Sequence, residues 1–130
     1  MLTIEDRQDI AETLALHAYV FDENQLDRLG DLFVPHAVYD MSAVEMGVFQ
    51  GVEEIGSAAA RMSASGLSPR AHFVTNVIAT ETGEGTASVR SKGLMIMHDG
   101  AIRAALHDDT LRRHDGRWLI SRRVVIPVEA

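Results

Sequence analysis

The sequence contains no cysteine, and this absence excludes a disulfide framework, a thiolate metal site and a thiol nucleophile. It also has no run of about 18 consecutive apolar residues, which a membrane-spanning helix would need. The first ten residues, MLTIEDRQDI, carry acidic side chains at once and lack the basic segment and apolar run of a secretory leader. We therefore expect a cytoplasmic protein with no membrane partner.

Basic residues are few and scattered along the chain. Twelve Lys and Arg stand against nineteen Asp and Glu, and the net charge is −7. A nucleic-acid-binding surface needs a basic stripe that can neutralise phosphates. We expect no nucleic-acid partner.

Motifs for metal and cofactor binding are also missing. The chain has no glycine-rich phosphate loop and no Gly-x-Ser-x-Gly nucleophile turn. Its densest group of metal-ligand residue types is His107, Asp108 and Asp109, but neighbouring residues of a strand point to opposite faces. We expect neither a metal nor a cofactor.

The remaining composition is that of one folded domain, residues 1–130. Hydrophobic residues make up 46% of the chain and charged residues 24%. A chain of this length can bury roughly two thirds of the surface that its unfolded form exposes. We expect one core and no second domain.

The pattern of the chain changes from helical to extended at about residue 70. The helical half predicts helices at about 3–21, 24–33 and 52–66, the second opened by Asn24 and ended before Pro35. Short strands are expected at 36–41 and 47–51. Long strands joined by short turns are expected at 70–80, 86–98, 101–113 and 117–128. Helices followed by an antiparallel meander predict an α+β fold.

Strand alternation places ionisable side chains in otherwise apolar rows. The row of the first long strand holds His72 and Asn76, unless a bulge intervenes, and the row of the third holds His107 and Asp109. The last strand adds Arg123. Burial of these groups in a dry core would cost free energy of desolvation. We therefore expect the rows to line one small enclosed pocket that contains a histidine.

The first helix can contribute to the same pocket. His17 lies in its apolar stripe one turn before Phe21, and Asp22 follows where the helix ends. Structural roles explain these residues as well: His17 as a hydrogen-bonded core residue, Asp22 as a cap of the second helix, and Arg123 as an exposed sheet charge.

Three segments together resemble the SnoaL-like family of the nuclear transport factor 2 superfamily. They are ALHAYVFDENQLDRLGDLFVPHAVYDMS, HFVTN and RRHDGRWLISRR, and they are nearest in pattern to scytalone dehydratase and hexachlorocyclohexane dehydrochlorinase. The resemblance implies a cone-shaped cystatin-like roll, with three N-terminal helices packed on a curved mixed or antiparallel sheet.

The resemblance also implies a site, in which an Asp after the first helix pairs with a His on the first long strand. The matching positions are Asp22 and His72, while Arg123 matches an arginine near the end of the last strand and His17 matches a cationic helix position. The candidate catalytic residues are His72, Asp22 and Arg123, and the candidate substrate-binding residues are His17, Tyr19, Phe21, Asn76 and His107.

The implied function is that of a lyase or isomerase. The Asp–His pair would remove a proton from carbon of a small apolar or aromatic substrate, as a dehydratase, dehydrohalogenase or isomerase does. One alternative is an epoxide hydrolase that uses Asp40, Arg103 and Asp109. Another is a non-catalytic module of the same fold that binds a small ligand or a partner.

The outer face of the sheet is expected to carry the apolar residues left over from the inner rows, such as Phe73, Val77, Met95, Met97 and Leu106. Domains that resemble this one commonly pair back to back through that face. We therefore expect a homodimer.

Overall fold

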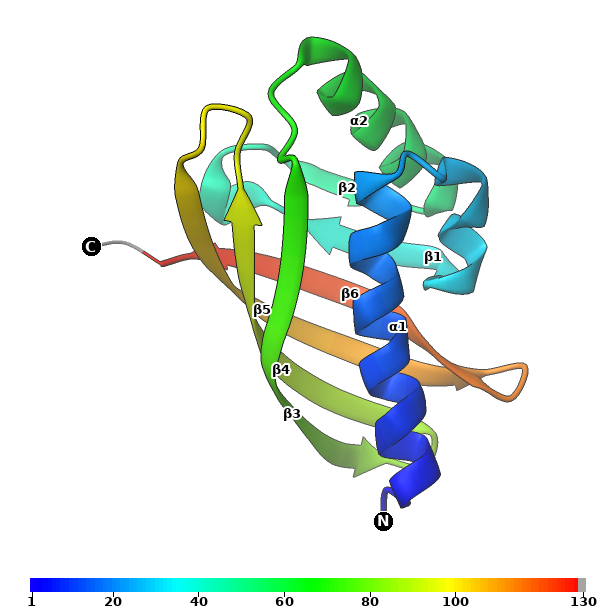
Figure 1. Ribbon diagram of the computed structural model, residues 1–130. Coiled ribbons are helices and arrows are strands. Elements are labelled where there is room, and N and C mark those ends of the chain that lie inside the picture. The colour runs from blue at the N-terminus through cyan, green and yellow to red at the C-terminus, as the bar shows by residue number, and fades with distance from the viewer. Residues whose placement is uncertain (129–130) are drawn as a thin grey trace.

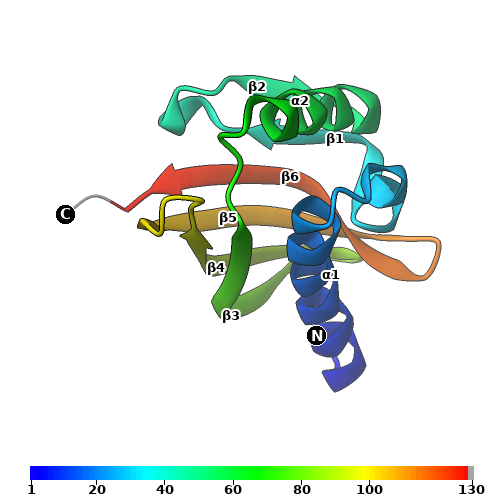
Figure 2. The same cartoon turned by 45° about the horizontal axis from the view of Figure 1, so that its top comes forward.

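The computed structural model describes residues 1–128 and shows a curved sheet with a long helix lying across its concave side (Figures 1 and 2). In chain order the elements are the helix α1 (Ile4–Asp22), the 3-10 helix η1 (Leu26–Asp31), β1 (Phe33–Asp40), the 3-10 helix η2 (Ser42–Val44), β2 (Val48–Gln50), the helix α2 (Val52–Ser65), β3 (Ala71–Gly83), β4 (Thr86–Ile96), β5 (Ile102–His114) and β6 (Arg117–Pro127). Within residues 1–128, no helix is long and apolar enough to span a membrane.

All six strands belong to one sheet, in the order β2-β1-β6-β5-β4-β3. The four long strands form successive antiparallel hairpins, as the sequence predicts, whereas β1 runs parallel to β6. The parallel pair makes the sheet mixed. The α+β class is confirmed, and α2 covers β1 and β2 at one end of the sheet (Figure 1).

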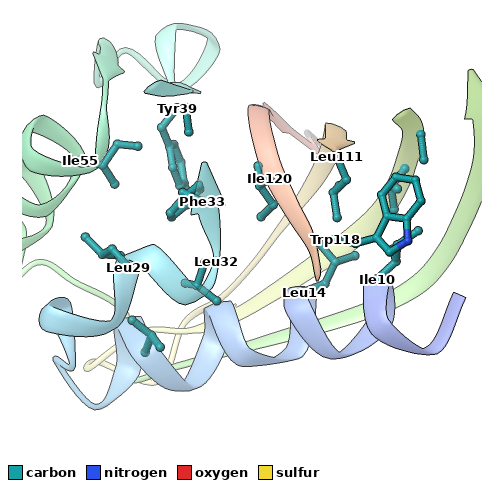
Figure 3. Close-up of a cluster of buried hydrophobic side chains, with 14 of the residues drawn as sticks. Ile10, Leu14, Leu29, Leu32, Phe33, Tyr39, Ile55, Leu111, Trp118 and Ile120 are labelled. Carbon is teal, nitrogen blue, oxygen red and sulfur yellow. The ribbon is translucent and has the colours of Figure 1, made fainter. Parts of the chain in front are cut away.

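The core is formed where α1 crosses the sheet (Figure 3). Ile10 and Leu14 point from one face of the helix toward Leu111, Trp118 and Ile120 on β5 and β6, and each of these side chains is buried. A second part of the same cluster joins η1, β1 and α2 through Leu29, Leu32, Phe33, Tyr39 and Ile55. This packing holds the C-terminal end of α1 over the concave face.

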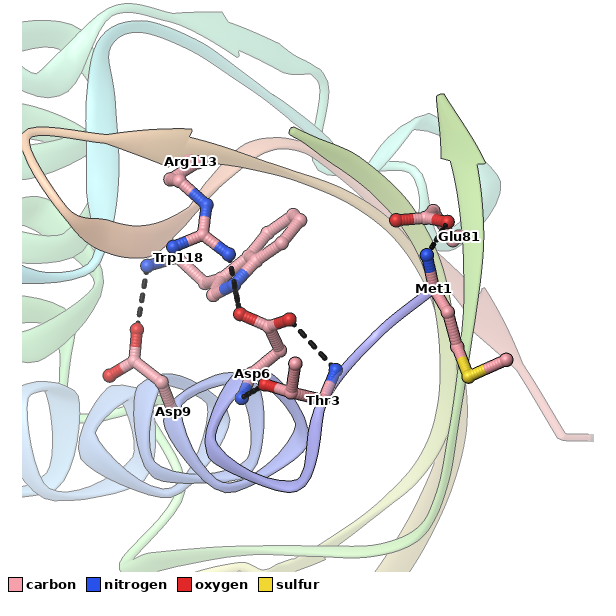
Figure 4. Close-up of polar contacts among 7 residues, drawn as sticks. All are labelled: Met1, Thr3, Asp6, Asp9, Glu81, Arg113 and Trp118. Carbon is pink, nitrogen blue, oxygen red and sulfur yellow. Dashed lines mark hydrogen bonds and ion pairs between the residues drawn. The ribbon is translucent and has the colours of Figure 1, made fainter. Parts of the chain in front are cut away.

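The first turn of α1 is bound to the β5–β6 hairpin through Asp6 (Figure 4). Its carboxylate accepts hydrogen bonds from the backbone of Thr3 at 2.8 Å and from the indole of Trp118 at 3.0 Å, and it also pairs with Arg113. The bonds from Thr3 and Trp118 hold the pKa of Asp6 well below its ordinary value. Thr3 and Asp6 form a capping box, and through Asp6 this box also fixes the helix to the sheet.

The second expected helix is shorter than the pattern predicts. It is a 3-10 helix of six residues, and Asn24 does not cap it, since its φ of 53° places it in the left-handed region. The strand β1 begins at Phe33 and includes Pro35, which the sequence reading placed ahead of the strand. Proline has no N–H to donate, and the pairing of β1 with β6 is irregular between Phe33 and Val38.

The prediction that Asn76 shares a face with His72 is wrong, because a bulge interrupts β3. The pairing with β4 shifts between Thr75 and Ile78, and Asn76 adopts a φ of 55°. Asn76 is exposed, and the inner row passes from His72 and Val74 to Ala79 rather than to Ile78.

The expected outer row is only partly right. Phe73 and Val77 are exposed, but Met95 lies directly opposite His72 in the β3–β4 ladder and packs against the core. Directly opposed residues point to the same face of a sheet, so Met95 belongs to the concave side.

Replacement of Leu14 by Ala should lower the free energy of unfolding by about 2–5 kcal/mol, because the fully buried side chain leaves a cavity between α1 and the sheet. The matched control is Leu67→Ala, which removes the same atoms from a residue that is 72% exposed and should change stability by less than about 0.5 kcal/mol. Urea unfolding followed by circular dichroism measures both. Equal losses for the two variants would contradict this account of the core.

Candidate active site

Asp22 and His72 meet where the last residue of α1 reaches the start of β3. The carboxylate oxygen Oδ1 lies 2.5 Å from Nδ1 of the imidazole, and Oδ2 accepts a hydrogen bond of 2.8 Å from the backbone N–H of His72. The side chains are 26% exposed for His72 and 19% for Asp22. The contact favours the proton on Nδ1, which leaves Nε2 as an acceptor.

Asp22 has no role as a helix cap in this arrangement. Both of its oxygens bind His72, and η1 begins without a side-chain cap. The carboxylate thus fixes the position of the strand through the backbone and the orientation of the ring through Nδ1.

His17 and Phe21 bring a second imidazole toward the dyad. They lie four residues apart on one face of α1, and their rings stack with centroids 4.3 Å apart and an interplanar angle of 11°. The His17 ring is 6.5 Å from that of His72 and meets it edge-on. Tyr19 does not reach the site: two residues along a helix turn it to the opposite side, and it is 62% exposed. The prediction that Tyr19 lies in the substrate-binding site is therefore wrong.

Arg123 and Asp109 form a buried ion pair beneath these residues. They lie opposite each other on β6 and β5, with Nε to Oδ1 and Nη2 to Oδ2 both at 2.8 Å. The side chains are 2% and 0% exposed. Burial acts to lower the pKa of Arg123, but the attraction and hydrogen bonds of Asp109 outweigh it and hold that pKa above its ordinary value. Arg123 is a cation that faces its own partner rather than an accessible surface.

Tyr39 links the ion pair to His17. Its hydroxyl lies 3.1 Å from Nε2 of His17, and the Arg123 guanidinium is near the same hydroxyl. Burial raises the pKa of Tyr39, so the phenol stays protonated. Tyr39 is not among the site residues that the sequence predicts. The alternation of β1, in which Ala37 and Tyr39 are both buried, is the signal that could have placed it.

His107 extends the concave surface over a glycine. A Cβ at Gly93 would stand 2.6 Å from Cε1 of His107, so only glycine leaves room for this ring position. The hydroxyl of Ser91 lies 3.5 Å from its Nδ1. Burial, together with the nearby Arg123 and His72, lowers the pKa of His107 to about 2, and its imidazole is neutral.

His17 is neutral for the same reason. Burial lowers the pKa of His17 well below its ordinary value, and Arg123 adds to the effect. Two uncharged imidazoles therefore flank His72. Among the described residues, no group of three or more His, Asp or Glu is placed to hold a metal ion.

The trio required by the epoxide hydrolase alternative is not assembled. Asp109 pairs with Arg123 on the concave side, whereas Asp40 pairs with Arg122, the preceding residue of β6. Consecutive residues of a strand point to opposite faces, so the two carboxylates are on opposite sides of the sheet. Arg103 is exposed and forms no ion pair within residues 1–128.

Two hollows at the surface of the protein differ from the expected enclosed pocket around the dyad. Two surface hollows of about 510 and 490 Å³ lie along β1, and both are lined by Pro35, His36 and His114. Neither includes Asp22 or His72. The dyad is instead open to solvent at one edge, through the exposed fractions of its two side chains.

The fold is a small α+β roll in which one long helix lies on a single curved sheet. The model of the SnoaL-like domain matches residues 2–124, and the chain belongs to this family. The resemblance drawn from the sequence is confirmed. No curated protein matches the chain.

Solved structures support the same fold over nearly the whole chain. A proposed aromatic ring hydroxylase from Novosphingobium aromaticivorans is 25% identical, with a TM-score of 0.86 and coverage of 100% of this chain and 94% of the other. A proposed scytalone dehydratase from the same organism is 20% identical, with a TM-score of 0.79 and coverage of 97% and 86%. LinA is 19% identical, with a TM-score of 0.81 and coverage of 98% and 92%. Two further matched structures are described as having a cystatin-like fold, which confirms the expected roll. At identities of 20% and 19%, the similarity to the proposed scytalone dehydratase and to LinA establishes the fold alone.

Stability should fall as the pH is lowered from about 7 to about 5. The pKa of both His17 and His107 is depressed in the folded state, so below about 6.5 only the unfolded chain takes up their protons, and each contributes a slope of about 1.4 kcal/mol per pH unit. The double variant His17→Gln/His107→Gln should flatten this slope, whereas His36→Gln, at an exposed position, should not. Asp6 does not contribute to the slope in this range. Its pKa is also depressed in the folded state, so its protonation lowers stability only below about pH 4. The measurement is the urea midpoint of each protein across this pH range. The same slope in all three proteins would refute the depressed pKa values of His17 and His107.

Proposed function

We propose that the chain is a small-molecule lyase or isomerase in which His72, oriented by Asp22, removes a proton from carbon. The observation that carries the proposal is the two-point contact between them: one carboxylate oxygen on the ring nitrogen and the other on the backbone of the same residue. Such a contact leaves one imidazole nitrogen free as a base and supplies a negative charge that stabilises the imidazolium.

The proposed step begins with Nε2 of His72. This nitrogen takes a proton from a carbon next to a carbonyl or an aromatic ring, and the electron pair moves into the substrate. The intermediate then expels a leaving group from the neighbouring carbon, or takes the proton back at another carbon. General base catalysis of this kind contributes roughly 10²–10⁴-fold to the rate.

A small apolar or aromatic substrate fits the surroundings of the dyad. Phe21, Val74 and Met95 are apolar, partly buried and near His72 in the helix or the ladder. The description of one matched structure, a proposed scytalone dehydratase, agrees with a lyase-type reaction.

A non-catalytic module is the weaker alternative. A ligand-binding or assembly domain has no need of a half-buried, hydrogen-bonded Asp–His pair, whose desolvation opposes folding. The pair therefore favours an enzyme over a scaffold.

Exchange of carbon-bound hydrogen in D₂O tests the base without knowledge of the native substrate. The probe is 2-tetralone, an uncharged aromatic ketone with an acidified C–H, and its deuteration is followed by NMR. The native protein should accelerate exchange, and both His72→Gln and Asp22→Asn should lower the rate about 10²–10⁴-fold. His36→Gln is the matched control, since it removes an exposed histidine outside the site. Folded His72→Gln protein that exchanges the ketone as fast as the native protein would overturn the proposal.

We also propose that the chain forms a homodimer through the convex face of β3–β5, which no helix covers in Figures 1 and 2. Phe73 and Leu94 are opposed there, with Ala104 next to Leu94, and Phe73 is 51% exposed. The net charge of −7 opposes self-association, but on this face acids are paired with bases, as in Arg90–Asp108 and Arg122–Asp40. A second copy could therefore pack here without strong repulsion.

Light scattering at micromolar concentration should give the mass of a dimer. Leu94→Lys should yield a folded monomer, because it places an unpaired charge in the centre of the apolar patch. Ile4→Lys, which adds the same charge at an apolar residue of α1 that is 85% exposed and lies outside this face, should leave the dimer intact. A monomeric native protein would contradict the interface.

A further inference from the structure

The two surface hollows along β1 have no part in the proposed reaction. They adjoin each other, because Pro35, His36 and His114 line both. The wall of the first also includes Phe33, Gly51 and Val52, and the wall of the second includes Val34, Arg112 and Ser121. The second, of about 490 Å³, is called the basic hollow below. Together the two hollows form one elongated groove.

The groove exists because the pairing of β1 with β6 is interrupted. Phe33 pairs with Ile120 and Val38 pairs with Arg122, so β1 takes five residue steps where β6 takes two. The pairing of β6 with β5 also skips Ser121. Surplus residues cannot all follow the ladder, and they bend the strand locally. The backbone itself therefore shapes the depression between the two strands.

The charge of the basic hollow is opposite to that of the whole chain. The net charge of the chain is −7, yet each residue that lines this hollow is neutral or basic. Arg113 is already occupied, since it pairs with Asp6 and lies over the ring of Trp118. Arg112 is exposed, and its side chain makes no hydrogen bond or ion pair within residues 1–128. Arg112 is therefore the cation that can receive a ligand.

The position of acidic residues gives the groove a direction. His114 is two residues along β5 from Arg112, so the two side chains point to the same face of the strand. Nε2 of His114 lies 3.5 Å from Asp115, but the carboxylate is 93% exposed and such a contact is weak. Glu53 lines the first hollow and not the basic hollow. An anionic group is therefore expected beside Arg112, with the rest of the ligand in the first hollow.

We propose that this groove is a second ligand site, for an organic carboxylate with an apolar body. The guanidinium of Arg112 offers two parallel N–H donors to the planar carboxylate, and the imidazole of His114 adds a further N–H. The apolar body lies against Pro35 and extends toward Phe33 and Val52. One available guanidinium suits a single negative charge better than a phosphate dianion. The volume of the basic hollow is within the roughly 300–1,000 Å³ of small-molecule sites.

The groove is separate from both the dyad and the proposed dimer interface. Leu111 points into the core beneath α1, so Arg112, the next residue of β5, points to the convex side, away from His72. Ala104, in the proposed interface, is eight residues from Arg112 on the same strand, which is about 26 Å at roughly 3.3 Å per residue. Occupation of the groove therefore requires neither a working base nor a dissociated dimer.

Titration of ¹⁵N-labelled protein with 4-phenylbutyrate, followed by NMR, tests the site residue by residue. The probe should shift the amides of Val34 and Ser121 in the basic hollow and those of Gly51 and Val52 in the first hollow. Acetate should shift only the first pair, and the uncharged 4-phenylbutanol should bind at least about 10-fold more weakly. The proposal is overturned if 4-phenylbutyrate leaves Val34 and Ser121 unshifted up to its solubility limit, if the alcohol binds as tightly, or if inorganic phosphate binds more tightly than acetate.

Substitutions at Arg112 test its role in the same titration. Arg112→Gln should weaken 4-phenylbutyrate binding about 10-fold or more, as loss of a hydrogen bond to a charged group does, and Arg112→Lys should keep part of the affinity because it retains the charge without the fork. Arg103→Gln is the matched control: Arg103 is also on β5, exposed and without an ion pair within residues 1–128, but it lies outside the groove. Folded Arg112→Gln protein with native affinity would overturn the proposal.

The variant His72→Gln separates this inference from the proposed function. It should bind 4-phenylbutyrate in the groove with native affinity, although it loses the exchange of 2-tetralone. Absence of groove binding in a protein whose ketone exchange depends on His72 refutes the second site alone. Native ketone exchange in His72→Gln, together with intact groove binding, refutes the proposed base alone.

Discussion

The buried ion pair of Arg123 and Asp109 constrains the rest of the site, because neither charge is tolerated in the interior without the other. The pair requires the register that sets the two residues opposite each other on β5 and β6. It also holds the guanidinium near Tyr39, whose hydroxyl lies 3.1 Å from Nε2 of His17.

The Asp22–His72 contact depends on a different part of the fold. It joins residues 50 positions apart, and it forms only because α1 crosses the concave face at an angle that brings its end to the start of β3. Ile10 and Leu14, earlier on the same helix, set that angle by packing on β5 and β6. The ordinary hydrophobic core and the candidate dyad are therefore two ends of one rigid element.

The errors of the sequence reading have specific physical causes. Tyr19 was misplaced although the helical period itself excludes it from the face of His17 and Phe21. Asn76 was misplaced because a bulge depends on long-range pairing: its left-handed backbone is unfavourable by itself and is held in place by the β3–β4 ladder. Met95 was assigned to the outer face because the register between two strands cannot be read from either strand alone.

By itself, the sequence determined the α+β class, the order of helices and hairpins, and the exclusion of thiol chemistry. These depend on residue type and on periods of two to four residues, which are local properties. The family resemblance added the pairing of Asp22 with His72. Only the tertiary structure decided that Arg123 faces Asp109 and that Tyr39 reaches His17, because these contacts join separate elements and a shift of one residue in strand register would turn the strand side chains to the other face.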